Sequence, residues 1–173
     1  MKVRPLPFLF SFLVLAATVP LLAADPTPTT APPRLEVTVE VQREVVKVDA
    51  SGRSQVVLEP VKAAHPGDVL VYSLRATNVG LAPARQAQIE DPIPAGTVLM
   101  TESVAAPAKN VRASLDGGKT WQEFPATVAV RRDDGQVERV PAPADAYTHL
   151  RWVLEGSLPP GESAEVGFKV KVQ

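Results

Sequence analysis

The chain has 173 residues with 18 basic and 19 acidic side chains, so its formal net charge at pH 7 is −1. A balance this even provides no electrostatic footprint for DNA, RNA or an anionic membrane surface, and we expect no nucleic-acid partner. Cysteine is absent, which excludes disulfides, thiolate metal sites and a cysteine nucleophile. Eighteen prolines and ten glycines favour many short elements over long helices.

The first 24 residues have the composition of a secretory signal peptide. Lys2 and Arg4 give a positive start, residues 6–22 are apolar, and small residues follow up to Ala24. Two prolines interrupt the apolar run and no basic cluster follows it, which favours a cleaved leader over a permanent anchor. We therefore predict a signal peptide over residues 1–24, no stable membrane span after cleavage, and export to the periplasm, the outer membrane or the extracellular space.

The rest of the chain divides into a linker and one domain. Residues 25–34 are rich in proline and threonine and predict an extended linker, whereas residues 35–173 have the length of a single domain. Apolar and polar side chains alternate at the start of this domain; the apolar positions are Leu35, Val37, Val39 and Val41. Because successive strand side chains point to opposite faces, the pattern predicts a strand whose four aliphatic residues are buried in the core.

Turn residues divide the domain into further strands. Short strands are predicted over residues 45–48 and 55–58, joined by a tight turn that ends at Gly52. Later strands are predicted at 70–76, 87–90, 98–100, 111–115, 120–122, 128–130, 150–154 and 165–172. Residues 131–147 are predicted to be a polar connection with a turn at Asp133-Asp134-Gly135. About nine or ten strands, with turn signals every 8 to 12 residues, predict an immunoglobulin-like antiparallel β-sandwich.

Several short motifs follow one another in a recognisable order. They are Pro66-Gly67-Asp68, Tyr72, Asn78-Val79-Gly80, residues 91–96, residues 114–121 and residues 158–161. Together they resemble the bacterial surface repeat domain called domain of unknown function 11, over residues 35–173. The resemblance implies an immunoglobulin-like sandwich in a secreted, outer-membrane or cell-wall protein, and it provides no catalytic residues to transfer. Members often occur as tandem repeats, whereas this sequence has one copy.

Residues 114–121 match the Asp-box pattern, with Ser114, Asp116, Gly118 and Trp121 in the required places. The resemblance to sialidase-like propellers implies a structural hairpin, and a single copy argues against a propeller. A structural turn is therefore favoured over a carbohydrate contact.

Catalysis and metal binding find little support in the sequence. The histidines are His65 and His149, and neither belongs to a recognisable serine-triad or four-ligand metal pattern. Asp133 and Asp134 are expected to form a solvated turn rather than a calcium site. We expect no enzyme activity, no metal and no cofactor.

Four aromatic residues remain to be assigned. Tyr72 and Trp152 lie among aliphatic neighbours and are predicted to pack in the core, which leaves Trp121 and Tyr147 as possible ligand contacts. The favoured function is a non-catalytic envelope or surface module for scaffolding, adhesion or protein–protein interaction through loops or strand edges. Its expected partner is an envelope or surface protein or a polysaccharide. The alternative is a carbohydrate-binding module, which requires Trp121 and Tyr147 to face solvent together.

Two further expectations concern the domain. Lys169 and Lys171 are predicted to guard a sheet edge against uncontrolled pairing. The third functional hypothesis is a hydrolase, which would require a histidine beside a nucleophile in a cleft.

Overall fold

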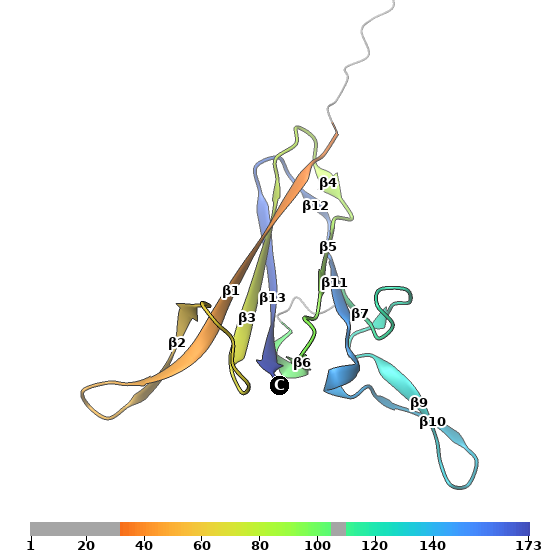
Figure 1. Ribbon diagram of the computed structural model, residues 1–173. Coiled ribbons are helices and arrows are strands. Elements are labelled where there is room, and N and C mark those ends of the chain that lie inside the picture. The colour runs from red at the N-terminus through yellow and green to blue at the C-terminus, as the bar shows by residue number, and fades with distance from the viewer. Residues whose placement is uncertain (1–31, 105–109) are drawn as a thin grey trace, which may run out of the picture.

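A computed structural model describes residues 32–104 and 110–173 (Figure 1). The predicted signal peptide and most of the predicted linker lie outside these residues. The described part contains thirteen strands, all paired antiparallel. No helix in these two ranges is both long enough and apolar enough to cross a membrane.

Two larger sheets and two small ones contain all these strands. The five-stranded sheet has the order β2-β1-β3-β13-β6 and consists of β1 (Leu35–Val48), β2 (Ser54–Pro60), β3 (Val69–Asn78), β6 (Thr97–Met100) and β13 (Ser163–Val172). The four-stranded sheet has the order β5-β11-β7-β8 and consists of β5 (Gln88–Pro92), β7 (Val111–Ser114), β8 (Gln122–Glu123) and β11 (His149–Val153). The small sheets pair β9 (Thr127–Arg131) with β10 (Val137–Pro141), and β4 (Ala84–Arg85) with β12 (Ser157–Leu158).

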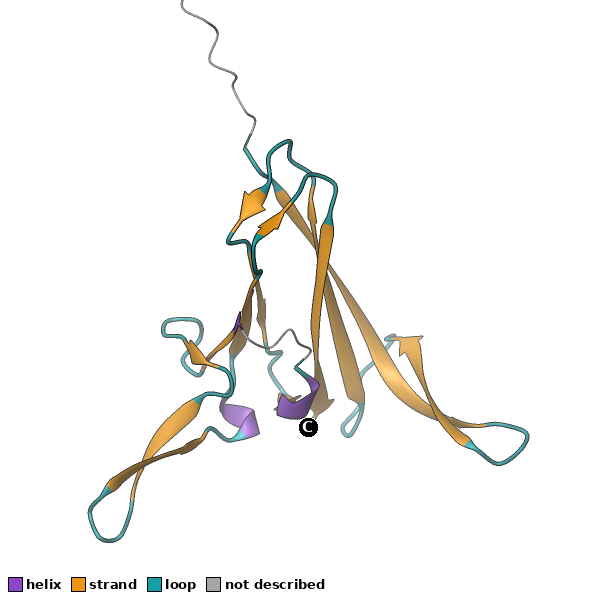
Figure 2. Ribbon diagram, turned by 180° about the vertical axis from the view of Figure 1, so that it is seen from behind, coloured by secondary structure: helices purple, strands orange, loops and turns teal. Residues whose placement is uncertain are grey.

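The larger sheets face each other as an all-β sandwich, which confirms the predicted fold class. Seen from either side, they converge at the end that carries β4 and β12 and diverge toward the opposite end (Figure 2). Two hairpins project outward from the wider end, β1–β2 on one side and β9–β10 on the other (Figures 1 and 2).

Aromatic and aliphatic side chains from both sheets fill the space between them. Phe168 stacks on Tyr72 with ring centroids 4.9 Å apart and on Trp152 at 6.0 Å. Leu74 and Leu150, from opposite sheets, are completely buried. Trp152 is buried and Tyr72 packs against the core, so the predicted role of both residues is confirmed.

Strand β1 differs from its predicted form. It runs without a break from Leu35 to Val48, so the predicted strand at residues 45–48 is its distal end. Val37 and Val39 pair in register with the buried Ala76 and Leu74, yet they are 47% and 45% exposed. The prediction that Val37 and Val39 are buried is therefore wrong. Alternation shows which residues share a face, but burial also needs a second layer over that face, and nothing in the described residues covers β1 here.

Two other predictions need correction. Strand β13 lies between β3 and β6, so Lys169 and Lys171 do not guard an edge, and Lys169 instead forms an ion pair with Glu44. The turn at Asp133-Asp134-Gly135 is present, with Gly135 N–H donating to Arg132 C=O at 2.9 Å. However, it joins β9 to β10, a strand that the pattern of residues 131–147 did not reveal.

Candidate functional site

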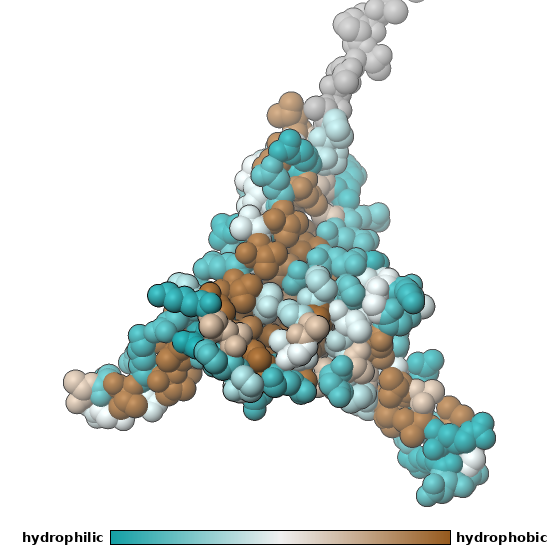
Figure 3. All heavy atoms as spheres, in the orientation of Figure 1, coloured by the Kyte–Doolittle hydropathy of each residue, from teal (hydrophilic) through white to brown (hydrophobic). Residues whose placement is uncertain are grey.

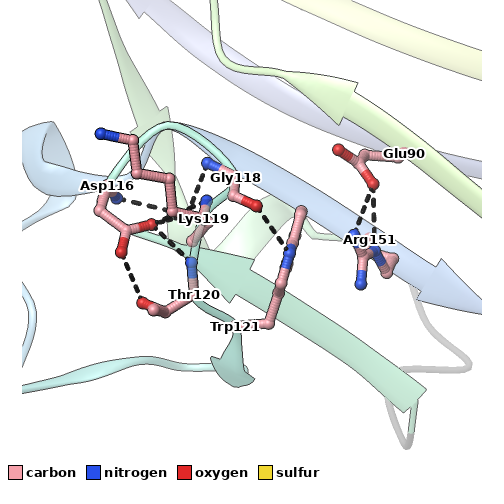
Figure 4. A network of polar contacts seen from close by, with 8 residues as sticks. Glu90, Asp116, Gly118, Lys119, Thr120, Trp121 and Arg151 are labelled. Carbon is pink, nitrogen blue, oxygen red and sulfur yellow. Dashed lines mark hydrogen bonds and ion pairs between the residues drawn. The ribbon is translucent and has the colours of Figure 1, made fainter.

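The turn between β7 and β8 is organised by two side chains, Ser114 and Asp116. Figure 4 shows Asp116 with its partner Thr120. Ser114 Oγ donates to Asp116 Oδ1 at 2.8 Å and accepts from Gly118 N–H at 2.9 Å. The Asp116 carboxylate accepts from the Thr120 hydroxyl at 2.6 Å and from Thr120 N–H at 2.9 Å. These bonds, led by the Thr120 hydroxyl, hold the pKa of Asp116 well below its usual range because they stabilise the ionised form. The predicted structural turn is confirmed.

Trp121 follows this turn and is held by contacts on its edge and on one face. Its Nε1–H donates to Gly118 C=O at 3.0 Å. The Arg151 guanidinium lies 3.7 Å from the ring centroid, a cation–π contact, and it is fixed by two hydrogen bonds to Glu90 of 2.8 and 3.1 Å (Figure 4). One face of the indole is therefore occupied by the chain itself.

Tyr147 lies in the core rather than beside Trp121 on the surface. It is only 4% exposed, its hydroxyl accepts a hydrogen bond from Ala126 N–H at 3.1 Å, and its ring packs 5.7 Å from that of Phe124. Burial raises the pKa of the Tyr147 hydroxyl. Sugar stacking needs an accessible aromatic face, so Trp121 and Tyr147 do not form the solvent-facing pair that the carbohydrate hypothesis requires.

Among the described residues, neither histidine side chain forms a hydrogen bond to a nucleophile. His65 is exposed, and its Nδ1 lies 3.7 Å from Asp68. His149 is opposite Ser114 in register, but the Ser114 hydroxyl donates to Asp116. No hydrogen bond links Ser114 to His149 among the described residues. The Nδ1 atom of His149 is buried and has no hydrogen-bond partner in this part of the chain. In residues 32–104 and 110–173, no cluster of three or more histidine, aspartate or glutamate side chains has the arrangement of a metal site.

The most unusual surface is on the projecting hairpin that we call the β1–β2 arm, residues 44–58. These residues of β1 pair only with β2, because the register of β1 with β3 ends at Arg43. One face of the arm carries four exposed aliphatic side chains: Val46 (65% exposed), Val48 (67%), Val56 (62%) and Leu58 (47%). Hydrophobic surface is visible over both projecting hairpins in Figure 3. Large aliphatic residues grouped in this way are a feature of interaction surfaces.

The arm is ordered by polar contacts at its tip and at its base. At the tip, Asp49 N–H donates to Arg53 C=O at 2.9 Å, and the Asp49 carboxylate accepts from Ser51 N–H at 2.8 Å. Hydrogen bonds led by that of the Ser51 hydroxyl lower the pKa of Asp49. At the base, Lys47 forms an ion pair of 2.8 Å with Glu59 on the opposite face. The tip of the arm is therefore polar, whereas the face with the four exposed aliphatic residues is apolar apart from Glu44, which lies opposite Leu58 and forms an ion pair with Lys169.

The sequence analysis did not identify this surface, although the sequence contains a signal for it. Val45-Val46 and Val56-Val57 are adjacent apolar pairs, and adjacent strand residues point to opposite faces. Such pairs place aliphatic side chains on both faces of the hairpin. A hairpin with two apolar faces has to be covered on both sides or expose one of them.

Comparisons with known proteins assign no function to this surface. No protein-family model, no curated protein and no solved structure matches the chain. The functional proposal therefore rests on the chemistry and geometry of the chain itself.

Proposed function

We propose that the chain is an exported, non-catalytic module of the cell envelope or surface that acts in scaffolding, adhesion or protein–protein interaction, with the β1–β2 arm as its contact surface. The observation that carries this proposal is the exposure of Val46, Val48, Val56 and Leu58 on one face of the arm. Burying a valine or leucine side chain fully is worth about 1.5–3 kcal/mol. A partner that covered this face would remove the cost of leaving all four in water.

The construction of the arm supports the same conclusion. A two-stranded ribbon on its own is only marginally stable in water, and this arm has no third strand beside it among the described residues. Polar side chains on both faces would have made it soluble without a partner. Instead Val46 lies directly opposite Val56, and Val48 and Leu58 share the same face, opposite Ser54 and Glu44 respectively, so four aliphatic side chains lie together on one face.

The other projecting hairpin, the β9–β10 arm (residues 127–141), provides an internal contrast. Its exposed valines are Val130 and Val137, and each lies opposite a charged residue, Glu138 and Arg131 respectively. Because adjacent strand residues point to opposite faces, Val130 and Val137 lie on different faces of this hairpin. The four exposed aliphatic residues of the β1–β2 arm share one face, although Leu58 there is also opposite a charged residue, Glu44. The β9–β10 arm therefore has the pattern of a solvated hairpin, and we assign the partner contact to the β1–β2 arm.

The proposed location rests on residues 1–24, which have the charge and apolar pattern of a secretory leader. The proposed immunoglobulin-like character and the relationship to domain of unknown function 11 rest on the order of the turn motifs. Both support a role outside the cytoplasm, where this domain would be presented to envelope or surface partners.

Site-specific photo-crosslinking tests the function directly. A photoreactive amino acid at position 56 of the chain, expressed in its source cells, is expected to give adducts of defined mass in the envelope fraction. The same residue at position 137, on the β9–β10 arm, is the matched control and is expected to give none. Equal adducts at both positions, or none at position 56, would argue against a contact surface on the β1–β2 arm. Mass spectrometry of the processed N-terminus tests cleavage after Ala24.

A further inference from the structure

We infer that the partner of the β1–β2 arm is a second copy of this chain, joined by antiparallel pairing of the two β2 strands around a twofold axis at Val57. This inference rests on the proposed function, because it identifies the partner of the same surface. It predicts a continuous sheet that runs through both molecules.

The first step is that β2 is an exposed strand edge whose charge and proline, Glu59 and Pro60, are confined to its end. It ends the five-stranded sheet, with β1 on one side and no strand on the other among residues 32–104 and 110–173. Residues 54–58 are Ser-Gln-Val-Val-Leu, with neither charge nor proline. Exposed edges are normally protected by charges, prolines, bulges or short length, because unpaired backbone groups bind other strands.

The other edge strands of the described sheets are shorter than the seven residues of β2. β5 carries Glu90, Asp91 and Pro92, and β10 carries Glu138, Arg139 and Pro141. β6, at the far end of the five-stranded sheet, is four residues long and none of them is exposed. β2 is the longest edge strand in the described structure, and its first five residues are uncharged; β9 is also uncharged before Arg131 but has five residues in all.

The second step is the direction of the backbone groups. Asp49 N–H donates to Arg53 C=O across the turn, and hydrogen-bonded residues alternate along an antiparallel pair. With the observed register, Gln55, Val57 and Glu59 therefore bond to β1. The N–H and C=O groups of Val56 and Leu58 point toward the free edge.

The third step is that a second copy satisfies these groups in a symmetric register. An interface around a twofold axis places the same strand antiparallel to itself. With Val57 on the axis, Val56 of one copy lies opposite Leu58 of the other, and both residues have their backbone groups directed across the edge. Each such pair can exchange both of its hydrogen bonds.

This register also suits the side chains on both faces. On the exposed face it sets Val56 of one copy against Leu58 of the other and extends the surface begun by Val46. On the opposite face, Glu59 meets the uncharged Gln55 of the second copy, which pairs with that copy's Lys47. Lys47 of one copy and Glu59 of the other thus lie in the same row of side chains across the interface. The only residue that faces its own counterpart is Val57, which is uncharged.

An intermolecular disulfide provides a test of this register. The natural chain has no cysteine, so Val57→Cys introduces one thiol per molecule. Directly opposed residues that do not share hydrogen bonds have Cα atoms about 4.5 Å apart, within the range of about 4.4–6.8 Å for disulfides. We expect the oxidised, processed Val57→Cys chain to migrate as a covalent dimer. Val130→Cys, at the equivalent edge position of the β9–β10 arm, should remain monomeric, and equal dimer from both variants would overturn the register.

Sedimentation velocity tests the association without a disulfide. The processed wild-type chain should show a monomer–dimer equilibrium, and Val56→Pro, which removes a donor from the free edge, should weaken it at least about tenfold, as expected for a loss of 1.4 kcal/mol or more. Ala129→Pro removes the corresponding outward donor from β9 and should leave the dissociation constant unchanged. Val56→Lys, which leaves the backbone intact, should weaken association as Val56→Pro does. A wild-type chain that stays monomeric at about 0.1 mM would overturn the inference.

The photo-crosslinking result separates this inference from the proposed function. Adducts at position 56 with a different protein, together with a monomeric purified chain, would reject self-pairing and leave the interaction role intact. Adducts with the mass of two copies of this chain would support both. A monomeric chain without adducts at position 56 would reject both.

Discussion

The centre of the sandwich and the β1–β2 arm contain the same kinds of side chain in the same kind of strand, but they bury them to opposite extents. Leu74 on β3 is fully buried, whereas Val46 on β1 is 65% exposed. The two strands are neighbours in one sheet. Leu74 lies opposite Val39 in register and faces the second sheet, whereas strand alternation places Val46 on the other face of the five-stranded sheet, which no second layer covers in the described residues. Apolar patterning therefore indicates a strand and its faces, and the layer opposite decides whether those faces are core or surface.

The largest expected effect tests this difference in burial. Leu74→Ala leaves a cavity in the packed centre and should lower the free energy of unfolding by about 2–5 kcal/mol. Val46→Ala in the arm should change it by no more than about 0.5 kcal/mol. Urea unfolding of both variants, at a concentration low enough to keep the chain monomeric, measures the two values. A similar loss in the two variants would mean that the arm is packed against something in the monomer.

A smaller effect is expected from the two turn hydroxyls. Ser114 is buried and connects Asp116 to the Gly118 amide, so Ser114→Ala should cost about 1–3 kcal/mol by leaving buried groups unsatisfied. Ser51 makes a similar bond to Asp49 at the exposed tip of the arm, where water replaces it, and Ser51→Ala should have little effect. Thermal unfolding followed by circular dichroism measures the stability of both variants. A greater loss of stability in Ser51→Ala than in Ser114→Ala would contradict the prediction.

The same two turns should differ in their response to acid. A carboxyl whose pKa is lower in the folded chain than the value of about 3.9 in the unfolded chain adds stability above that value. This stability is lost as the pH falls through the folded pKa. The pKa of Asp116 lies further below its usual range than that of Asp49. Asp116→Asn should therefore flatten the fall in thermal midpoint below about pH 5 more than Asp49→Asn does. An unchanged acid profile in Asp116→Asn would contradict the hydrogen-bonded carboxylate.

The smallest effect concerns the arginines beside these turns. Arg151 stacks on Trp121, and Arg151→Ala should cost about 0.5–1 kcal/mol and open the indole to solvent. Arg53 is on the exposed tip of the arm, and Arg53→Ala should be close to neutral. Quenching of tryptophan fluorescence by acrylamide should increase in Arg151→Ala alone, because Trp152 stays buried. No increase would show that Arg151 does not shield Trp121.

Much of the fold was predictable from local chemistry. The strand predicted at residues 70–76 is present as part of β3, and its alternating apolar residues Leu70, Leu74 and Ala76 are buried because the opposite sheet covers them. The Asp116 turn was also predictable, since its hydrogen bonds join residues within five positions of one another. Strand β10 was missed because Glu138 and Arg139 are polar on a hairpin that projects into solvent.

The candidate surface and the position of Tyr147 were less accessible to sequence reasoning. The burial of Tyr147 depends on contacts with Ala126 and Phe124, more than twenty positions away. The exposure of Val46 and Val56 depends on which face of the five-stranded sheet the second sheet covers, because both residues lie on the other face.

The sequence by itself determined the all-β class, the positions of the main turns and which residues share a strand face. These properties follow from backbone geometry and the period of two, which act over a few residues. Only the tertiary structure decided that Tyr147 is core, that Lys169 lies on a central strand, and that the valines of the β1–β2 arm face water. The physical reason is that burial and edge position depend on the packing and order of strands from distant parts of the chain, which no local pattern specifies.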